Sequence, residues 1–314
     1  MLVVFDGVKL LDIAGPAEVF AEANRFGADY RLTVASVDGR PVQTSIGVPF
    51  TATGRISALE SADTVMVAGG DALVGRPIDP ELVDALKTAA TRTRRLASVC
   101  TGSFVLAQAG LLSGRRATTH WRHAGLLARA FPDITVEPDA IFVRDGDVFT
   151  SAGVSSGIDL ALALVEQDHG TEVAREVART LVVYLKRAGG QSQFSVLVES
   201  YSPPSQSTLR GVLDSIAADP GAGHTVKSLA ARASLSTRQL TRLFRAELGI
   251  TPARYVETVR IDIARAALDS GRSVTDTARL AGFGSTETLR RVFATHLGIS
   301  PKAYRDRFRT SAQR

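Results

Sequence analysis

Short apolar runs alternate with amphipathic stretches along roughly the first 187 residues. The apolar runs cover 1–5, 30–37, 63–70 and 94–99, and the stretches with helical spacing cover 12–27, 80–92 and 104–112. Short runs of this kind, separated by helical segments, are typical of parallel strands with helices packed on both faces. The pattern therefore predicts a doubly wound α/β domain of the flavodoxin-like type.

The end of this domain departs from the alternation. The dipeptide Asp145-Gly146, inside the segment 141–153, predicts a hairpin turn and an antiparallel strand pair. Helices are expected at 155–168 and 172–187, and the stretch that follows is rich in Gly, Ser and Pro, as linkers are. These signals place a first domain at 1–188, a linker at 189–206 and a second domain at 207–314.

The second domain contains a duplication. Residues 236–255 and 285–304 are identical at ten of twenty aligned positions. Upstream of them the offset between the copies is one residue shorter, so the second copy gains a residue at its turn. Each copy has the pattern of a short helix, a tight turn and a longer helix. The sequence therefore predicts an all-α domain with two helix-turn-helix units.

Capping signals mark the longer helix of each copy. Ser236 and Gln239 form a capping box at the start of the first, and we expect Gly284 and Glu287 to be its weaker counterpart in the second. Residues at matching positions are expected to end these helices and open the next ones: Gly249, Thr251 and Pro252, then Gly298, Ser300 and Pro301. The helix that opens at Pro252 is long and stops near Gly271.

The exposed face of each longer helix carries side chains that can read DNA. These residues are Arg238, Gln239, Arg242 and Arg245 in the first copy, and Ser285, Thr286, Glu287, Arg290 and Arg291 in the second. Arginine can form two hydrogen bonds with guanine, glutamine can do so with adenine, and glutamate accepts from cytosine. A helical interaction domain with solvated arginines is the alternative, but the duplication favours two recognition helices in double-stranded DNA.

Charge and composition agree with this division. Residues 1–205 carry 19 Lys and Arg against 23 Asp and Glu, whereas residues 206–314 carry 18 against 9. The single cysteine allows no internal disulfide, and the five histidines form no cluster with ligand spacing, so neither a metal nor another cofactor is expected. The first residues lack a basic leader, and no apolar run is long enough to span a bilayer. We expect a cytoplasmic, nucleoid-associated protein.

The duplicated segment resembles the AraC/XylS-type DNA-binding domain over residues 206–309. The resemblance rests on GITPARYVETVRIDIARAAL and AGFGSTETLRRVFATHLGISPKAYR. In that family a long helix joins two helix-turn-helix units, and a further helix, here STLRGVLDSIAA, precedes the first. The resemblance implies a transcription regulator that binds promoter DNA in adjacent major grooves, commonly as a homodimer.

The first domain has its candidate chemistry at Cys100. Ligand pockets of doubly wound sheets lie beyond the carboxyl ends of the strands, where the turn VCTG would place Cys100 and Thr101. The positive end of the following helix would lower the pKa of the thiol. Other residues expected at this rim are Asp12, Glu18, Gly69, Gly70, His120 and Trp121. The plainer alternatives are a buried cysteine that only fills space and a Glu18 on the surface of its helix.

The segments LLDIAGPAEVF, VMVAGG, ASVCTGSFVLAQAGLLSGRRATTHW and FTSAGVSSGIDLALALVEQDHG are similar to the ThiJ/PfpI superfamily, whose fold is like that of class I glutamine amidotransferases. Joined to an AraC-type domain, they resemble the GlxA family of regulators. In enzymes of the superfamily, the position of Cys100 is a nucleophile, Glu18 or Asp12 matches the assisting acid, and His120 matches a histidine. Regulators of this architecture are thought to bind small nitrogen compounds.

Three hypotheses follow for the whole chain. In the first, the amidotransferase-like domain senses a small effector near Cys100 and dimerises, and the other domain binds promoter DNA. An acid pair and Trp121 would suit a cationic ligand. In the second, Cys100 also acts as the nucleophile of a hydrolase or hydratase. In the third, the protein binds DNA constitutively and its first domain only dimerises.

Overall fold

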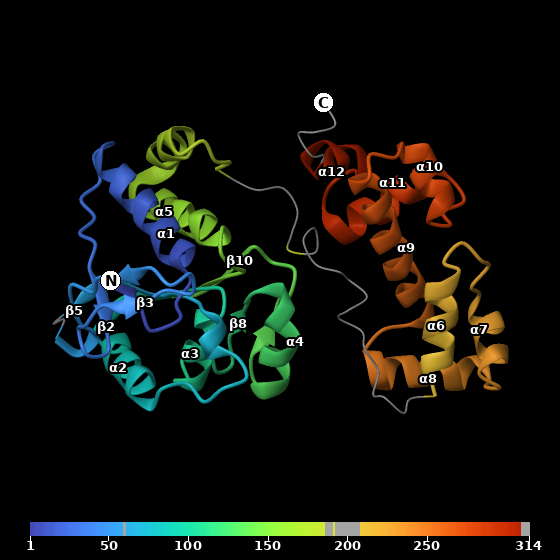
Figure 1. The fold of residues 1–314 in the computed structure, drawn as a ribbon, viewed down its shortest axis with the longest axis horizontal. Helices are drawn as coiled ribbons and strands as arrows, with labels where there is room; N and C mark the ends of the chain where they lie inside the picture. The colour runs from blue at the N-terminus through green and yellow to red at the C-terminus, as the bar shows by residue number, and fades with distance from the viewer. Residues whose placement is uncertain (59–60, 186–190, 192–207, 309–314) are drawn as a thin grey trace. The chain divides into compact units, whose positions relative to one another are not determined.

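A sheet of seven strands forms the centre of the N-terminal unit in the computed structural model, which describes residues 1–58, 61–185, 191 and 208–308. The strands lie in the order β10-β11-β7-β6-β1-β2-β5 (Figure 1). Their bounds are Leu2–Val3 (β1), Val34–Ser36 (β2), Gly54–Arg55 (β5), Ala62–Val67 (β6), Thr93–Val99 (β7), Phe142–Asp145 (β10) and Val148–Ser151 (β11). All neighbours are parallel except β10 and β11.

The hairpin predicted at Asp145-Gly146 is confirmed. Asp145 pairs with Val148 at the end of the antiparallel ladder, and Gly146 has a φ of 61°, the left-handed conformation that such turns require. Two small sheets lie outside the main one, formed by β3 (Val42–Gln43) with β4 (Pro49–Phe50) and by β8 (Arg116–Ala117) with β9 (Thr135–Val136).

Helices cover both faces of the sheet, which confirms the doubly wound prediction (Figure 1). The helices are α1 (Leu10–Asn24), α2 (Pro80–Ala90), α3 (Gly102–Gln108), α4 (Trp121–Ala130) and α5 (Ser156–Thr180), with 3-10 turns at Ile56–Ala58 (η1) and Asp71–Leu73 (η2). Because successive strand residues point to opposite faces, Met66 packs towards α1 and α5, whereas Val65 and Val67 pack towards α2 and α3. The sheet is therefore buried on both sides.

The two helices expected at 155–168 and 172–187 are joined at a kink. Gly170, with φ 85° and ψ 167°, interrupts the helical geometry inside α5. The second part ends at Thr180, earlier than predicted, and Val182 follows with a φ of 56°. No described helix has the length and apolar character needed to cross a membrane.

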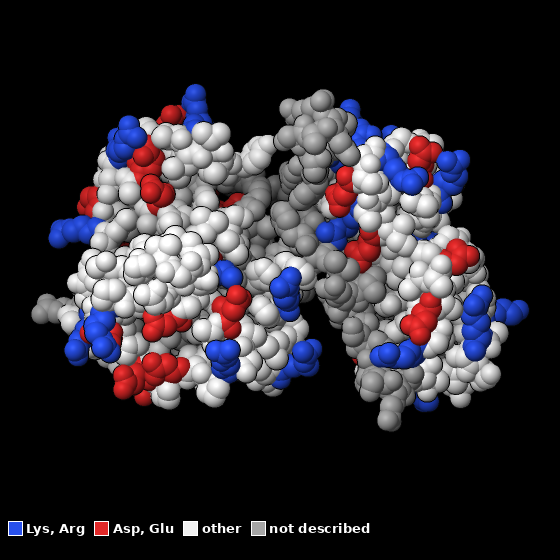
Figure 2. Space-filling model, in the orientation of Figure 1, with Lys and Arg blue, Asp and Glu red and all other residues white. Residues whose placement is uncertain are grey.

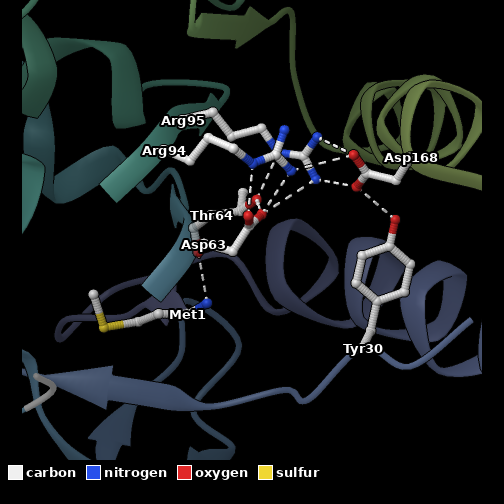
Figure 3. A network of polar contacts seen from close by, with 7 residues as sticks. All are labelled: Met1, Tyr30, Asp63, Thr64, Arg94, Arg95 and Asp168. Atoms are coloured by element: carbon white, nitrogen blue, oxygen red, sulfur yellow. Dashed lines mark hydrogen bonds and ion pairs between the residues drawn. The ribbon is translucent and has the colours of Figure 1, made fainter. Parts of the chain in front are cut away.

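A polar network ties α5 to the amino ends of β6 and β7 (Figure 3). The guanidinium of Arg95, whose side chain is 2% exposed, forms two hydrogen bonds with the carboxylate of Asp168, one of them at 2.8 Å. Tyr30 donates to the same carboxylate at 2.8 Å, and Arg94 bridges Asp168 and Asp63. Burial alone would raise the pKa of Asp168, but the hydrogen bonds from Arg95 and Tyr30 hold it below its ordinary value.

The C-terminal unit is all-helical and repeats its own packing. Its helices are α6 (Arg210–Ala218), α7 (Val226–Arg232), α8 (Thr237–Leu248), α9 (Pro252–Asp269), α10 (Val274–Leu280), α11 (Thr286–Leu297) and α12 (Pro301–Phe308). Phe244 packs edge-on against Tyr255 with centroids 5.9 Å apart, and Phe293 packs the same way against Tyr304 at 5.4 Å. Both predicted helix-turn-helix units are therefore present, and α6 supplies the preceding helix.

The long helix α9 belongs to both helix-turn-helix units. Tyr255 and Val259 pack in a core with α6, α7 and α8, whereas Ile261 and Leu268 pack in a second core with α10, α11 and α12. Each unit thus has its own apolar core, and α9 contributes to both.

Most predicted caps are confirmed. Ser236 accepts a hydrogen bond from the backbone of Gln239, whose side chain in turn accepts from Ser236, and Gly249 and Gly298 end α8 and α11 in the left-handed conformation. The cap expected at Gly284 with Glu287 is wrong. Glycine has no side-chain acceptor, and the hydroxyl of Ser285, one residue later, accepts from the backbone N–H of Thr288 at 3.1 Å.

The chain consists of two compact units, Met1–Arg187 and Ala188–Arg314. The linker expected at 189–206 lies outside the described residues apart from residue 191.

The Asp168 network predicts a large stability effect from a single change. Asp168→Ala leaves the buried guanidinium of Arg95 without its main partner, and Asp63, 3.8 Å away, replaces it only in part. Breaking a buried pair on one side costs about 3 kcal/mol or more, so the free energy of unfolding, measured by urea denaturation, should fall by about that amount.

The matched control is Asp84→Ala. Asp84 pairs with Lys87 at 3.4 Å, and their side chains are 75% and 51% exposed, so its loss should cost less than about 1 kcal/mol. Equal effects of the two substitutions would show that the network does not stabilise the unit.

Candidate functional site

The outer face of α8 presents arginines to solvent. Arg238, Arg242 and Arg245 are exposed, and within the described part of the chain none of them has a hydrogen-bond or ion-pair partner. Figure 2 shows lysine and arginine side chains spread over the visible face of the C-terminal unit rather than gathered in one patch. Unpaired guanidinium groups along the exposed face of a capped helix are suited to contacts with base edges or phosphates.

The side chain of Gln239 caps the start of the same helix. Its side-chain oxygen accepts hydrogen bonds from the backbone N–H of Ser236 at 2.9 Å and from the Ser236 hydroxyl at 2.8 Å. Two-bond recognition of adenine needs both the oxygen and the nitrogen of the amide. Gln239 could therefore read adenine only by giving up its capping bonds.

The corresponding face of α11 is partly paired within the helix. Arg290 lies 3.5 Å from Glu287, and both side chains are exposed. Ser285 caps the helix, and Thr286 is half-buried beside it. Arg291 is exposed and has no partner among the described residues, which makes it the counterpart of the free arginines on α8.

The second site lies at the carboxyl end of β7, where the chain turns sharply at Cys100. Cys100 has a φ of 56°, an uncommon conformation for a residue with a side chain, and it connects β7 directly to α3. Its N–H donates to the carbonyl of Ser151 at 3.0 Å, and its carbonyl accepts from the hydroxyl of Thr119 at 2.9 Å. The backbone at the elbow is thus fixed from both sides.

Glycines allow the chain to close around this elbow. A Cβ on Gly69 would lie 2.6 Å from the Cβ of Cys100, and one on Gly102 would lie 2.4 Å from the carbonyl oxygen of Val67. Gly70 and Thr101 are joined by hydrogen bonds of 2.8 Å in both directions. Gly69 and Gly102 are therefore needed for close approach, and not for an unusual φ.

Asp12, and not Glu18, is the acid beside the cysteine. Asp12 is fully buried, and one of its carboxylate oxygens accepts from the N–H of Gly69 at 2.9 Å. The other oxygen has no partner in the described structure, and burial raises the pKa of this carboxyl to about 6. Glu18 is exposed on α1 and does not line the cavity described below.

The expectation of a lowered thiol pKa is wrong. Burial, followed by the negative charge of Asp12, raises the pKa of Cys100 to about 12. The backbone N–H groups of Thr101 and Val154 lower the pKa, but the loss of water outweighs them. The thiol is therefore protonated at neutral pH.

A cavity of about 250 Å³ opens beside the thiol. Its lining residues are Lys9, Asp71, Cys100, Thr101, His120, Trp121, Arg122 and His123. Of the residues expected at this rim, Cys100, Thr101, His120 and Trp121 line the cavity, whereas Asp12, Gly69 and Gly70 lie behind Cys100 and Thr101. In the described part of the chain, no group of His, Cys, Asp and Glu side chains is arranged to hold a metal ion.

Sequence reasoning missed half of this lining. Lys9 and Asp71 form an ion pair of 3.0 Å across the rim, and Arg122 and His123 come from the first turn of α4. The sequence did offer two signals. Asp71 directly follows the glycine pair, and HWRH at 120–123 gathers polar and aromatic groups where α4 begins.

His120 starts α4 rather than belonging to a strand. Its ring nitrogen accepts from the backbone N–H of Arg122 at 3.3 Å, and burial and the nearby His123 lower its pKa to about 4, so the ring is neutral. The structure places no hydrogen bond between His120 and the Cys100 thiol. A Cβ on Gly153 would touch both side chains, so this glycine lies against both.

Trp121 already faces a cation of its own chain. The guanidinium of Arg122 lies 5.2 Å from the centre of the indole ring, and the ring of His120 lies 5.5 Å away at an interplanar angle of 31°. Since Lys9 is paired with Asp71, Arg122 is the uncompensated charge at the rim. The wall of the cavity is thus positive, which is the opposite of the cation site that the sequence predicts around Trp121.

Comparisons with known proteins agree with both halves of this description. The profile of the DJ-1/PfpI family matches residues 1–167, and that of a helix-turn-helix domain matches residues 229–307. The HTH-type transcriptional regulator CdhR of Pseudomonas aeruginosa is 34% identical over 281 residues, which cover 89% of this chain and 83% of that protein.

Two further matches each cover a little more than half of the chain. Isonitrile hydratase of Pseudomonas putida is 36% identical over 176 residues, which are 55% of this chain and 73% of the enzyme. The crystal structure of an AraC family transcriptional regulator from Pseudomonas putida matches with a TM-score of 0.52 and 26% identity, covering 57% of this chain and 97% of that one.

The family is thus shown by a profile that covers more than half of the chain and by a regulator that aligns with nearly all of it. As the resemblance to the GlxA regulators predicted, the chain belongs to the DJ-1/PfpI family and is a transcription regulator with an AraC-type helix-turn-helix domain.

Proposed function

We propose that the N-terminal unit of this regulator binds a small metabolite in the cavity beside Cys100 and that binding changes the affinity of the C-terminal unit for promoter DNA. The observation that carries the proposal is a cavity at the carboxyl ends of the strands whose cysteine is held neutral. A neutral thiol favours retention of a ligand over its conversion, because the thiolate is the nucleophile. Retention is what a sensor requires.

The lining of the cavity indicates the class of ligand. A volume of about 250 Å³ suits a small metabolite, and the guanidinium of Arg122 suits a carboxylate. Asp71, on the opposite side of the ion pair with Lys9, could accept a hydrogen bond from a nitrogen of the ligand. The proposed effector is therefore a nitrogen-containing acid, and its acidic group, rather than a cation over Trp121, supplies the main contact.

The remaining parts of the proposal concern partners and location. The two recognition helices read adjacent major grooves of promoter DNA, and the protein acts as a homodimer in the cytoplasm, at the nucleoid. The free arginines on α8 and α11 support the reading of promoter DNA by the two helices. The architecture shared with HTH-type regulators supports the homodimer and the location at the nucleoid.

A second candidate function is a Cys100-dependent hydratase or hydrolase. The sharp elbow at Cys100 and the similarity to isonitrile hydratase favour it. The raised pKa of the thiol and the missing hydrogen bond to His120 oppose it within the described structure. A Cys100-dependent reaction would need the ligand itself to bring a base or to change the surroundings of the thiol.

The DNA-reading role predicts different effects for arginines that are similarly exposed. Sites are first selected from genomic fragments with the full-length protein. Arg242→Ala and Arg291→Ala should then each weaken binding to the selected site by about 1 to 3 kcal/mol. The affinity of each variant for other sequences should stay close to that of the wild type. Arg279→Ala is the control, because Arg279 lies on α10 and pairs with Asp276 at 2.8 Å. Equal losses on all sequences would reassign both arginines to phosphate contacts.

The sensing role predicts a ligand whose binding depends on Arg122. In a thermal-shift screen of amino acids and related nitrogen-containing acids, one compound should raise the melting temperature and change the affinity for the selected DNA. At one hundred times its Kd, a ligand stabilises the folded state by about 2.7 kcal/mol. Arg122→Ala should remove the shift, and Arg129→Ala, at the far end of α4, should keep it.

Incubation of the protein with the stabilising compound distinguishes a sensor from an enzyme. Recovery of the compound unchanged supports the sensor, whereas conversion by the wild type but not by Cys100→Ser would establish the enzyme. A complete screen without any stabilising compound would instead support a constitutive regulator whose N-terminal unit only dimerises.

A further inference from the structure

The two helix-turn-helix units touch each other at a point outside the helix that joins them. The loop between α6 and α7 meets the turn between α10 and α11 at Gly282. A Cβ on Gly282 would lie 2.7 Å from the Cα of Gly221 and 2.9 Å from the carbonyl oxygen of Pro220. Both are backbone atoms, so a side chain here could be accommodated only if the two units moved apart.

Arg260, near the middle of α9, holds the same loop in place. Its Nε donates to the carbonyl oxygen of Pro220 at 2.9 Å, and one of its Nη atoms donates to the carbonyl oxygen of Ala222 at 3.0 Å. Arg260 forms no ion pair with any described residue, and its rigid planar group fixes the positions of two carbonyls in a way that the flexible ammonium of a lysine does not. A Cβ on Gly282 would also lie 3.2 Å from Nε of Arg260. Arg260, the loop and Gly282 therefore form one joint.

The joint matters because the apolar cores of the two units are separate. One core contains Leu240 and Phe244 of α8, and the other contains Leu289 and Phe293 of α11. A further polar contact joins His296 of α11 to Arg254 of α9 at 2.8 Å, but it fastens α11 only to the connecting helix. The Gly282 joint fastens the second unit to a loop of the first unit as well.

We propose that Gly282 and Arg260 are positioning residues that set the angle and separation of the two recognition helices, and thereby the spacing of the two DNA segments that the protein reads together. The proposal rests on the proposed DNA reading by both α8 and α11. Two linked binding modules gain affinity only when their geometry matches that of the two sites. A fixed joint would make one spacing strongly preferred.

The test is selection of binding sites from a random-sequence duplex library with the full-length protein. The wild type should select two short motifs at one separation. Gly282→Ala should broaden or shift that separation and bind the wild-type site about 10-fold more weakly, while its affinity for a duplex that holds a single motif stays unchanged. Arg260→Met, which keeps an unbranched side chain but removes both donors, should change the separation in the same way.

Gly249→Ala is the matched control. Gly249 has a φ of 72°, close to the 75° of Gly282, but a Cβ there would meet nothing within 4 Å. It should carry the same backbone strain without changing the separation of the motifs. An unchanged separation in both Gly282→Ala and Arg260→Met, or equal losses on single-motif and double-motif duplexes, would overturn the proposal. Failure of the wild type to select two motifs would instead remove the underlying proposal of DNA reading by both helices.

Discussion

The close packing of backbone around Cys100 is the constraint on which the N-terminal unit depends. Gly69 and Gly102 leave no room for a side chain, and the left-handed elbow places the thiol where α3 leaves the sheet. The same packing removes water from Cys100 and from Asp12 behind it. As a result, burial raises both pKa values, that of Cys100 to about 12 and that of Asp12 to about 6. At neutral pH the thiol is therefore protonated, whereas Asp12 is mostly ionised and adds to the shift of the thiol. The backbone has the geometry of a nucleophile elbow, but the surroundings of Cys100 keep its thiol protonated.

The C-terminal unit is built differently, because its two helix-turn-helix units have the same internal packing. The edge-on pairs Phe244 with Tyr255 and Phe293 with Tyr304 repeat at the same positions of the two copies. Duplication alone does not fix how the copies face each other. Helix α9 supplies one connection, and the close approach of Gly282 to the loop at Pro220, which Arg260 holds in place, supplies a second. Bending about α9 would break this second connection.

Local chemistry explains why most of the fold could be predicted from the sequence. Alternating apolar runs, the Asp145-Gly146 turn and the Ser236 cap depend on near neighbours in the chain, and all three are found. Periodicity would also have separated Asp12 from Glu18, because six residues are about one and two-thirds helical turns and place the two on different faces of α1. The structure accordingly buries Asp12 and exposes Glu18.

The sign of the Cys100 pKa shift could not be predicted locally. The shift is set first by burial and then by the charge of Asp12, and both depend on the whole fold. The backbone N–H groups of Thr101 and Val154 only reduce it. Lys9 and Asp71 were missed for a related reason, since 62 positions separate them in the chain and only the sheet brings them together.

Whether Cys100 is held as a protonated thiol can be measured by the rate at which iodoacetamide alkylates it in the native protein between pH 6 and pH 10. The cysteine is the only one in the chain, so mass spectrometry reports it alone. A protonated, buried thiol should show almost no alkylation across this range and rapid alkylation once urea unfolds the protein. Fast native alkylation that levels off below pH 8 would reveal a thiolate and contradict the protonated state.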